Sequence, residues 1–353
     1  MNHRIKRVQD FLKREKLDLL IVDHLVDLFY LTGVYLSIGR LIIEPESATL
    51  FVDARYFEMC QKRATVAVKL IERYGQEPFD FKGKRVGFDG TNTSYKVYNQ
   101  LKERVGKGLR SLDQPIRGLR QIKEPEELVL MRRAGRLAMR GYDYLLTLIK
   151  EGVSEEALAL ELEIFWRREG GQKLAFEAII AFGENSSQPH YQPGKRVLKQ
   201  GEPVLIDIGV VSDHYHSDMT RVVFCGEVDR KIEEIYEVVY RAQKVALELC
   251  RPGVLVRDVD QAARKVIDEA GYGKYFPHSL GHGVGLEIHE LPVLKSATPY
   301  GEVELVEGMV ITIEPGIYLP NVGGVRLEEM IAITSDGYEN LLGTPVASSA
   351  PIL

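Results

Sequence analysis

The sequence has few cysteines, one tryptophan and no uninterrupted apolar run long enough for a membrane helix. Its three cysteines, Cys60, Cys225 and Cys250, lie far apart and form no CxxC motif, which argues against a disulfide framework. We expect three reduced thiols. The longest apolar N-terminal stretch is broken by Asp23 and Asp27, and the first residues lack the apolar core of a signal peptide. The sequence therefore predicts a cytoplasmic protein with no membrane partner.

The overall composition is that of an ordinary globular protein large enough for two domains. The chain has 353 residues, of which 45% are apolar and 27% are charged. Its formal net charge is −5. A chain without a basic excess gives no reason to expect a nucleic acid partner.

The first 117 residues alternate helical and strand patterns, which is typical of a small α/β domain. We expect helices at 3–16, 54–63 and 95–105, and strands at 17–22, 40–43, 48–52, 66–73 and 85–89. This part contains neither a phosphate-binding glycine loop nor a cluster of catalytic residue types. We expect domain 1–117 to support the protein, to mediate oligomerisation or to shape the mouth of a site.

A change of pattern near residues 114–123 marks the start of a second domain, 118–353. A long helix begins at Lys123–Glu127, because Pro125 and its acidic neighbours favour a first helical turn. We expect that helix to continue to about Lys150. After Gly171 the sequence turns mostly to strands, with further helices at 231–249 and 256–269.

The stretch VLIDIGVVSDHYHSDMTRVV, residues 204–223, has the pattern of two apolar strands joined by a polar turn. With Ser212 and Asp213 at the tip, Asp207 faces Asp218 directly across the hairpin. Opposed residues have Cβ atoms roughly 4.5–5.5 Å apart, and two buried carboxylates at that distance need a proton or a cation. Two solvated aspartates on an edge hairpin are the alternative.

A second predicted hairpin repeats the arrangement in VITIEPGIYLPNVGGVRLEEMIAI. Folded about Asn321, it brings Glu314 opposite Glu328, and both glutamates interrupt apolar runs where an unpaired charge is costly. Clusters of oxygen ligands attract hard divalent cations. The two hairpins together therefore predict a carboxylate-rich metal site.

Six of the eight histidines lie within about one hundred residues around the first hairpin: His190, His214, His216, His278, His282 and His289. In FPHSLGHGVGLEIHE, Ser279 stands where a zinc-binding HExxH helix needs glutamate, and the alternating glycines disfavour a helix. These glycines also lack the following helix of a nucleotide loop. His282, between two glycines, is the favoured ligand candidate, while a structural role is favoured for His278 taken alone.

Taken together, these residues resemble the pita-bread metallopeptidases, the family of methionine aminopeptidase, prolidase and Xaa-Pro aminopeptidase. The resemblance covers about 118–345 and is carried by the ordered motifs DIG, SDMTR, GHGVG, TIEPG and GVRLE. Residues 1–117 resemble the creatinase-like N-terminal domain of the prolyl members. The resemblance implies an α/β fold class: a small α/β N-terminal domain followed by a pita-bread α+β catalytic domain that holds two divalent ions. Manganese is the expected metal, with cobalt or zinc as alternatives.

The resemblance also implies a role for each matching residue. The metal ligands would be Asp207, Asp218, His282, Glu314 and Glu328. Two such ions can lower the pKa of a shared water, and Glu314 would also carry its proton towards the leaving nitrogen. His190 and His289 match the family's catalytic histidines.

Three further residues match positions on the substrate side. His278 matches a pocket histidine of the prolyl members, and Tyr318 and Arg326 match positions that orient the neighbouring glutamates. A plain strand arginine is the alternative for Arg326.

The chain departs from the family pattern at two places. Ser212 and His214 stand where many relatives have tyrosine and glycine, so His214 and His216 are either accessory metal ligands or, as we favour, part of a variable hairpin tip. Val293 stands where dipeptide-cleaving relatives have an arginine that would pair with the substrate carboxylate.

The absence of this arginine favours an Xaa-Pro aminopeptidase that acts on peptides with proline in the second position. A prolidase is the first alternative, followed by methionine aminopeptidase. A binding or scaffold protein that has lost its chemistry is the alternative from another class. By analogy with the prolyl members, we expect a homodimer.

Overall fold

The computed structural model describes residues 3–74 and 77–353. The chain divides into two compact units, one ending at Arg120 and one beginning at Gln121. Each unit is described by itself.

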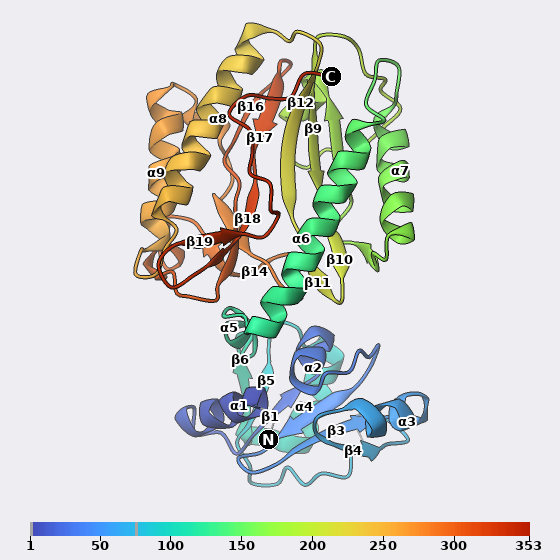
Figure 1. Cartoon of the computed structure of the whole chain (residues 1–353). Helices are drawn as coiled ribbons and strands as arrows, with labels where there is room; N and C mark the ends of the chain where they lie inside the picture. Colours follow the sequence, from blue (N-terminus) through green and yellow to red (C-terminus); the bar gives the residue numbers. More distant parts are fainter. Residues whose placement is uncertain (1–2, 75–76) are drawn as a thin grey trace. The chain divides into compact units, whose positions relative to one another are not determined.

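The N-terminal unit is built on a mixed sheet in the order β4-β3-β2-β1-β5-β6 (Figure 1). Strands β1 and β2 are antiparallel, as are β2 and β3, whereas β4, β5 and β6 join the sheet in parallel. The elements in chain order are α1 (His3–Arg14), β1 (Leu19–Val22), α2 (Leu25–Thr32), β2 (Arg40–Ile43), β3 (Ala48–Val52), α3 (Ala54–Arg63), β4 (Ala67–Leu70), β5 (Val86–Asp89), α4 (Tyr95–Val105), β6 (Leu109–Leu112) and α5 (Arg117–Arg120).

The helices and strands predicted for this unit are confirmed, with shifts of up to three residues at their ends. Three elements were not predicted, α2, β6 and the single-turn helix α5. Helix α2 is apolar and buried around most of its circumference, so it lacks the one-sided pattern that identifies an amphipathic helix. The helix ends in a common way, because Gly33 follows its last residue in the left-handed conformation with φ +74°.

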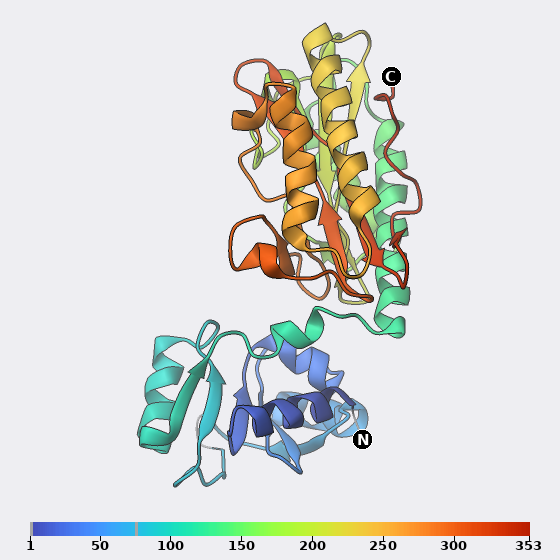
Figure 2. The same cartoon turned by 90° about the vertical axis from the view of Figure 1, so that its left-hand side faces the viewer.

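The C-terminal unit begins with the long helix α6 (Pro125–Leu146) and α7 (Glu155–Arg168). Pro125 stands in the first turn of α6, and Glu124 and Glu127 form a capping box there, as the sequence pattern indicated. Helices α8 (Arg230–Leu249) and α9 (Val256–Glu269) lie side by side (Figures 1 and 2). Their apolar faces join the main buried core of this unit.

Short antiparallel strands form the rest of the C-terminal unit in the sheets β12-β9-β8, β11-β10-β7, β14-β13-β15-β18-β19 and β16-β17. Their bounds are β7 (Lys173–Leu174), β8 (Ile179–Phe182), β9 (Glu202–Ile208), β10 (Val210–Ser212), β11 (Tyr215–His216), β12 (Met219–Cys225), β13 (Gly281–Gly283), β14 (Glu290–Leu294), β15 (Val310–Ile313), β16 (Gly316–Leu319), β17 (Gly323–Arg326), β18 (Glu329–Ile333) and β19 (Tyr338–Asn340).

The first predicted hairpin forms, but the predicted pairing of its two aspartates is wrong. Asp207 faces Thr220 on β12, because the turn lies at Asp213-His214, one residue later than expected. Both turn residues have positive φ, 49° and 71°, which two-residue hairpin turns of type I′ require. Asp218 lies two residues before Thr220, in the interruption between β11 and β12. It therefore stays on the same side of the hairpin as Asp207, diagonally displaced.

The second hairpin has the predicted register on both sides of an interruption. Ile313 pairs with Glu329, and Gly316 pairs with Arg326, so both ladders are centred on Asn321. Glu314 and Glu328 lie between the two ladders. The backbone N–H of Glu328 turns away from its own hairpin and donates to the carbonyl oxygen of Thr220 at 3.1 Å. The two hairpins therefore join where each of them is interrupted.

Two expectations about the whole chain can be compared with the structure. All three cysteines are free and buried, as predicted. Within residues 3–74 and 77–353, no helix combines the length and apolar character needed to cross a membrane.

Candidate metal centre

Five side chains from the interruptions and strands of the two hairpins and from β13 meet in one buried place. Asp207 comes from β9 and His282 from β13, whereas Asp218, Glu314 and Glu328 come from the interruptions described above. A strand end or an interrupted ladder lets a side chain leave the regular alternation of the sheet, so polar groups can gather there. All five predicted metal ligands are thus brought to the same region.

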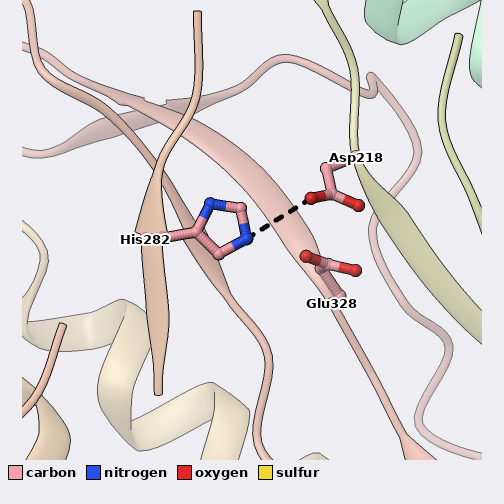
Figure 3. A group of neighbouring side chains, drawn as sticks. All are labelled: Asp218, His282 and Glu328. Carbon is pink, nitrogen blue, oxygen red and sulfur yellow. Dashed lines mark ion pairs between the residues drawn. The ribbon is translucent and has the colours of Figure 1, made fainter. Parts of the chain in front are cut away.

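Asp218, His282 and Glu328 form the tightest group, with one ligand atom of each within 4.8 Å of the others (Figure 3). His282 extends from β13 towards the two carboxylates, and its Nε2 lies 3.5 Å from Oδ2 of Asp218. Nε2 also lies 3.4 Å from Oε1 of Glu314. The three residues of the group are at most 9% exposed.

The hydrogen bonding of His282 decides which ring nitrogen faces the carboxylates. Nδ1 lies 3.0 Å from the carbonyl oxygen of Gly283, which can only accept a hydrogen bond, so Nδ1 carries the proton. Burial, followed by the neighbouring His289, lowers the pKa of His282 to about 3, and the ring is therefore neutral. The lone pair of Nε2 consequently points at carboxylate oxygens, an arrangement that a cation between them stabilises.

The four carboxyl groups of the site carry more negative charge than the protein itself balances. Burial raises the pKa of Asp218 and of Glu328 well above the ordinary value, and repulsion from the other carboxylates adds to the rise. Burial likewise raises the pKa of Glu314 to about 8. Among the described residues, Arg326 provides the one lysine or arginine side chain within ion-pair distance of these four groups.

Arg326 is held in the site by hydrogen bonds from each of its three side-chain nitrogens. It donates from Nη2 to Asp207 at 2.5 Å and from Nη1 to the hydroxyl of Tyr318 at 2.8 Å. The other oxygen of Asp207, Oδ1, is buried without a hydrogen-bond partner. An unpartnered buried carboxylate oxygen is costly unless it binds a cation. The donor set and this orphaned oxygen therefore fit a divalent metal ion.

A directed chain of hydrogen bonds leads from Arg326 to His278. Tyr318 accepts from Arg326 and donates to Nε2 of His278 at 2.8 Å. Nδ1 of His278 in turn lies 2.8 Å from the carbonyl oxygen of Ser279 and carries its proton. Burial lowers the pKa of His278 to about 4, which keeps the ring neutral at pH 7.

The remaining histidines lie in different surroundings. The ring of His289 is exposed and packs edge-to-face on His282, with 4.3 Å between the ring centroids. His190 is exposed and lies close enough to influence the charges of Asp207 and His278. His214 is in the hairpin turn, whereas His216 is buried and its Nδ1 lies 3.2 Å from the carbonyl oxygen of Gly285.

Two buried groups that support the site were not singled out from the sequence. Glu155 accepts four hydrogen bonds, including those from the Tyr191 hydroxyl and the Gly194 amide, and so fixes the loop that carries His190. Lys123 lies 3.1 Å from Glu290, which directly follows His289. A charged residue near a predicted helix start is usually solvated, so no sequence signal distinguished Glu155 or Lys123 from an ordinary surface residue.

Comparisons with known proteins agree with this arrangement. The sequence profile of "Metallopeptidase family M24" matches residues 129–335, and that of "Creatinase/Prolidase N-terminal domain" matches residues 4–122. The chain is 37% identical to the Xaa-Pro dipeptidase of Pyrococcus horikoshii over 347 residues, which covers 98% of both chains.

Two solved structures extend the similarity to the fold. The Xaa-Pro dipeptidase from Bacillus anthracis is 31% identical with a TM-score of 0.94 and matches over 99% of both chains. The X-Pro aminopeptidase from Thermotoga maritima is 27% identical with a TM-score of 0.85, covering 97% of this chain and 99% of the other. The predicted fold class, a creatinase-like N-terminal domain followed by a pita-bread domain, is confirmed. The chain is a hydrolase that belongs to metallopeptidase family M24.

Proposed function

We propose that this protein is an Xaa-Pro dipeptidase that depends on divalent metal ions. One observation carries the proposal: the buried carboxylate and histidine cluster lies in a chain that matches an Xaa-Pro dipeptidase over 98% of both lengths. This favours the prolidase alternative over the aminopeptidase that the absence of an arginine at position 293 led us to expect. The substrate would be a dipeptide with proline in the second position.

The metal would be held by Asp207, Asp218, His282, Glu314 and Glu328. The unpartnered Oδ1 of Asp207 and the lone pair of His282 Nε2 support this assignment. When bound, divalent ions in such a site lower the pKa of water and polarise the scissile carbonyl group. We propose two ions, with manganese as the first candidate and cobalt or zinc as alternatives.

Glu314 is the candidate for proton transfer. Its Oε1 accepts a hydrogen bond from Thr312 at 3.2 Å, which holds the carboxyl group beside the other ligands. In this position a carboxylate can take a proton from the attacking water and deliver it to the proline nitrogen as the peptide bond breaks. A proton must reach that nitrogen, because an amide anion is too basic to leave unprotonated.

The histidines divide into exposed and buried candidates. His190 and His289 are exposed and can contact a peptide, so we propose that they orient the substrate and stabilise charge on its carbonyl oxygen. His278 and Tyr318 belong to the chain that begins at Arg326. Since each side-chain nitrogen of Arg326 already donates to a protein partner, we propose that it acts on the substrate through Asp207 and Tyr318.

An Xaa-Pro aminopeptidase is the second candidate function, and Val293 is the observation that favours it. Val293 lies directly opposite His282 in the pairing of β13 and β14 and is half-buried. Opposed side chains are neighbours. An arginine at this position would lie beside the site, where it could pair with a dipeptide carboxylate. The chain has no cation at position 293, which leaves room for a longer peptide.

A cleavage assay separates the two candidates. Metal-stripped protein would be given manganese and tested on Ala-Pro, Ala-Pro-Ala and Met-Ala-Ser. The proposal predicts manganese-dependent release of alanine from Ala-Pro above the other two. Preference for Ala-Pro-Ala would contradict it and support the aminopeptidase. Val293→Arg is a useful companion, because it should raise activity on the dipeptide relative to the tripeptide.

The expected homodimer and the cytoplasmic location stay predictions.

A further inference from the structure

Thr220 occupies the position on β12 that faces Asp207, where the sequence pattern had suggested Asp218. Its side chain is fully buried. It was not among the residues that the sequence motifs marked as functional. Its contacts nevertheless connect the two hairpins at the metal site.

The hydroxyl group of Thr220 stands between a cation and an anion of the site. Nε of Arg326 donates to Oγ1 at 3.1 Å, so the single hydroxyl proton is free to point elsewhere. Oγ1 donates that proton to Oε2 of Glu328 at 2.7 Å. The carbonyl oxygen of Thr220 also accepts from the Glu328 amide at 3.1 Å. Glu328 is thus held by Thr220 at both its backbone and its carboxylate.

Two directed chains of hydrogen bonds consequently leave Arg326. One passes through Thr220 to Glu328, and the other passes through Tyr318 to His278. Hydrogen bonds to charged groups are the strong ones, and chains of them polarise one another.

We propose that Thr220 is a positioning residue whose hydroxyl group holds the Glu328 carboxylate and the Arg326 guanidinium in the arrangement that receives the metal. This inference rests on the proposed function, because Glu328 is a ligand only in a metal-dependent enzyme. In this role Thr220 is itself no metal ligand and acts through its hydrogen bonds to Glu328 and Arg326. It acts by fixing the rotamer of a carboxylate that would otherwise swing between partners.

The test compares substitutions that differ in the hydroxyl group. Thr220→Val keeps the shape and removes the hydroxyl, whereas Thr220→Ser keeps the hydroxyl. Thr32→Val is the matched control, because Thr32 is equally buried and its hydroxyl bonds to the Leu28 carbonyl oxygen at 2.6 Å, within the N-terminal unit. Manganese binding to each metal-stripped full-length protein would be measured by calorimetry, and kcat and KM on Ala-Pro would be measured separately.

We expect Thr220→Val to weaken manganese binding about 10–100-fold, the usual cost of losing an outer partner of a ligand. Its kcat should fall with little change in KM, while Thr220→Ser and Thr32→Val bind manganese like the unchanged protein. Manganese affinity of Thr220→Val equal to that of the unchanged protein would overturn the inference, as would a loss in Thr220→Ser as large as that in Thr220→Val.

Two further comparisons keep the result interpretable. Should Thr220→Val fail to fold, Thr220→Ala takes its place, because alanine and serine both lack the methyl group and differ only in the hydroxyl. Tighter manganese binding by Thr220→Ser than by Thr220→Ala supports the inference, and equal binding overturns it. Unchanged protein that binds manganese but does not cleave Ala-Pro contradicts the proposed function, whereas the affinity comparison still decides the role of Thr220. Unchanged protein that binds no divalent ion would contradict both.

Discussion

Several buried carboxylates of the N-terminal unit are paired with arginines, whereas those of the candidate metal centre outnumber the cations beside them. In the N-terminal unit, Asp27 pairs with Arg120 at 2.7 Å. There Arg40 contacts both Asp23 and Glu77, and Glu77 also contacts Arg104. Each of these carboxylates lies against a guanidinium group. A buried ion pair of this kind offsets much of its own desolvation cost.

At the candidate metal centre, four carboxylates gather around one arginine that is already bound to one of them. The same unit contains a balanced pair, Arg221 with Glu329, one residue after Glu328 in the chain. The neighbouring positions thus have opposite roles. The comparison teaches that burial of acidic residues does not itself indicate a metal site, whereas an excess of buried carboxylates over cations does.

The largest effect is expected from removing one of the unbalanced charges. In Asp218→Asn, kcat/KM on Ala-Pro should fall about 1000-fold, because ion-assisted charge stabilisation is worth several kcal/mol. The metal-free variant should nevertheless unfold at the same or a higher temperature than the metal-free parent, since the substitution relieves burial and repulsion of a carboxylate. Steady-state kinetics and calorimetric unfolding would check both parts. A metal-free variant that is less stable than the metal-free parent would contradict the claim that Asp218 is an unbalanced buried charge.

A balanced pair should respond in the opposite way. Lys123 and Glu290 are each 1% exposed in their side chains, and Lys123→Met removes the cation that lies 3.1 Å from the buried Glu290 carboxylate. We expect a loss of about 3–5 kcal/mol in the free energy of unfolding. Urea denaturation would measure it. The double variant Lys123→Met with Glu290→Gln should recover part of the loss, and a double variant as unstable as the single one would show that the charge is not the cause.

The two units should also differ in the sign of their pH dependence. In metal-free protein, Glu314 has its pKa raised by burial from 4.5 to about 8, so its stabilising contribution is complete below about pH 4.5 and is lost as the pH rises to about 8. In the N-terminal unit, the side-chain hydrogen bond from Arg85 lowers the pKa of the exposed Asp18 from 3.8 to about 2. Its contribution is present above pH 3.8 and is lost as the pH falls towards 2.

Unfolding temperatures of metal-free protein across pH 6.5–8, above the range in which the buried His278 and His282 contribute with the opposite sign, would reveal the first of these trends, and added manganese should abolish it. A metal-free protein whose stability rises steadily over this range would contradict the assignment of Glu314 to an unbalanced site.

The smallest effect is expected at an exposed pair. Lys62 and Glu58 in α3 are 70% and 82% exposed in their side chains. Lys62→Met should change the free energy of unfolding by about 0.5 kcal/mol or less, because water already solvates both charges. Urea denaturation of Lys62→Met and Lys123→Met would compare the loss in the free energy of unfolding at an exposed and at a buried lysine. Equal losses in the two variants would contradict the claim that burial makes the Lys123 pair important for stability.

The sequence predicted which acidic residues come together better than it predicted how their strands pair. The two glutamates were visible because each of them interrupts an apolar run, and a symmetric loop sufficed to place Glu314 opposite Glu328. The turn of the first hairpin was predicted one residue too early. The choice between Ser212-Asp213 and Asp213-His214 depends on which residues tolerate positive φ. Periodicity does not contain that information.

Other features depend on contacts between distant parts of the chain. The bond from Thr220 to Glu328 joins residues 108 positions apart, and the pair of Lys123 with Glu290 joins residues 167 positions apart. Such pairs leave no local pattern. Helix α2 was missed for a related reason, since a helix buried around most of its circumference has no polar side to reveal its period.

The most direct test of the central claim is a calorimetric titration of manganese chloride into metal-stripped protein at neutral pH, repeated with Asp218→Asn. An unbalanced carboxylate site predicts saturable binding by the unchanged protein, release of protons from the carboxyl groups on binding, and binding at least about 10-fold weaker in the variant. Equal binding by the two proteins, or no saturable binding by either, would contradict the claim that these carboxylates form a metal centre.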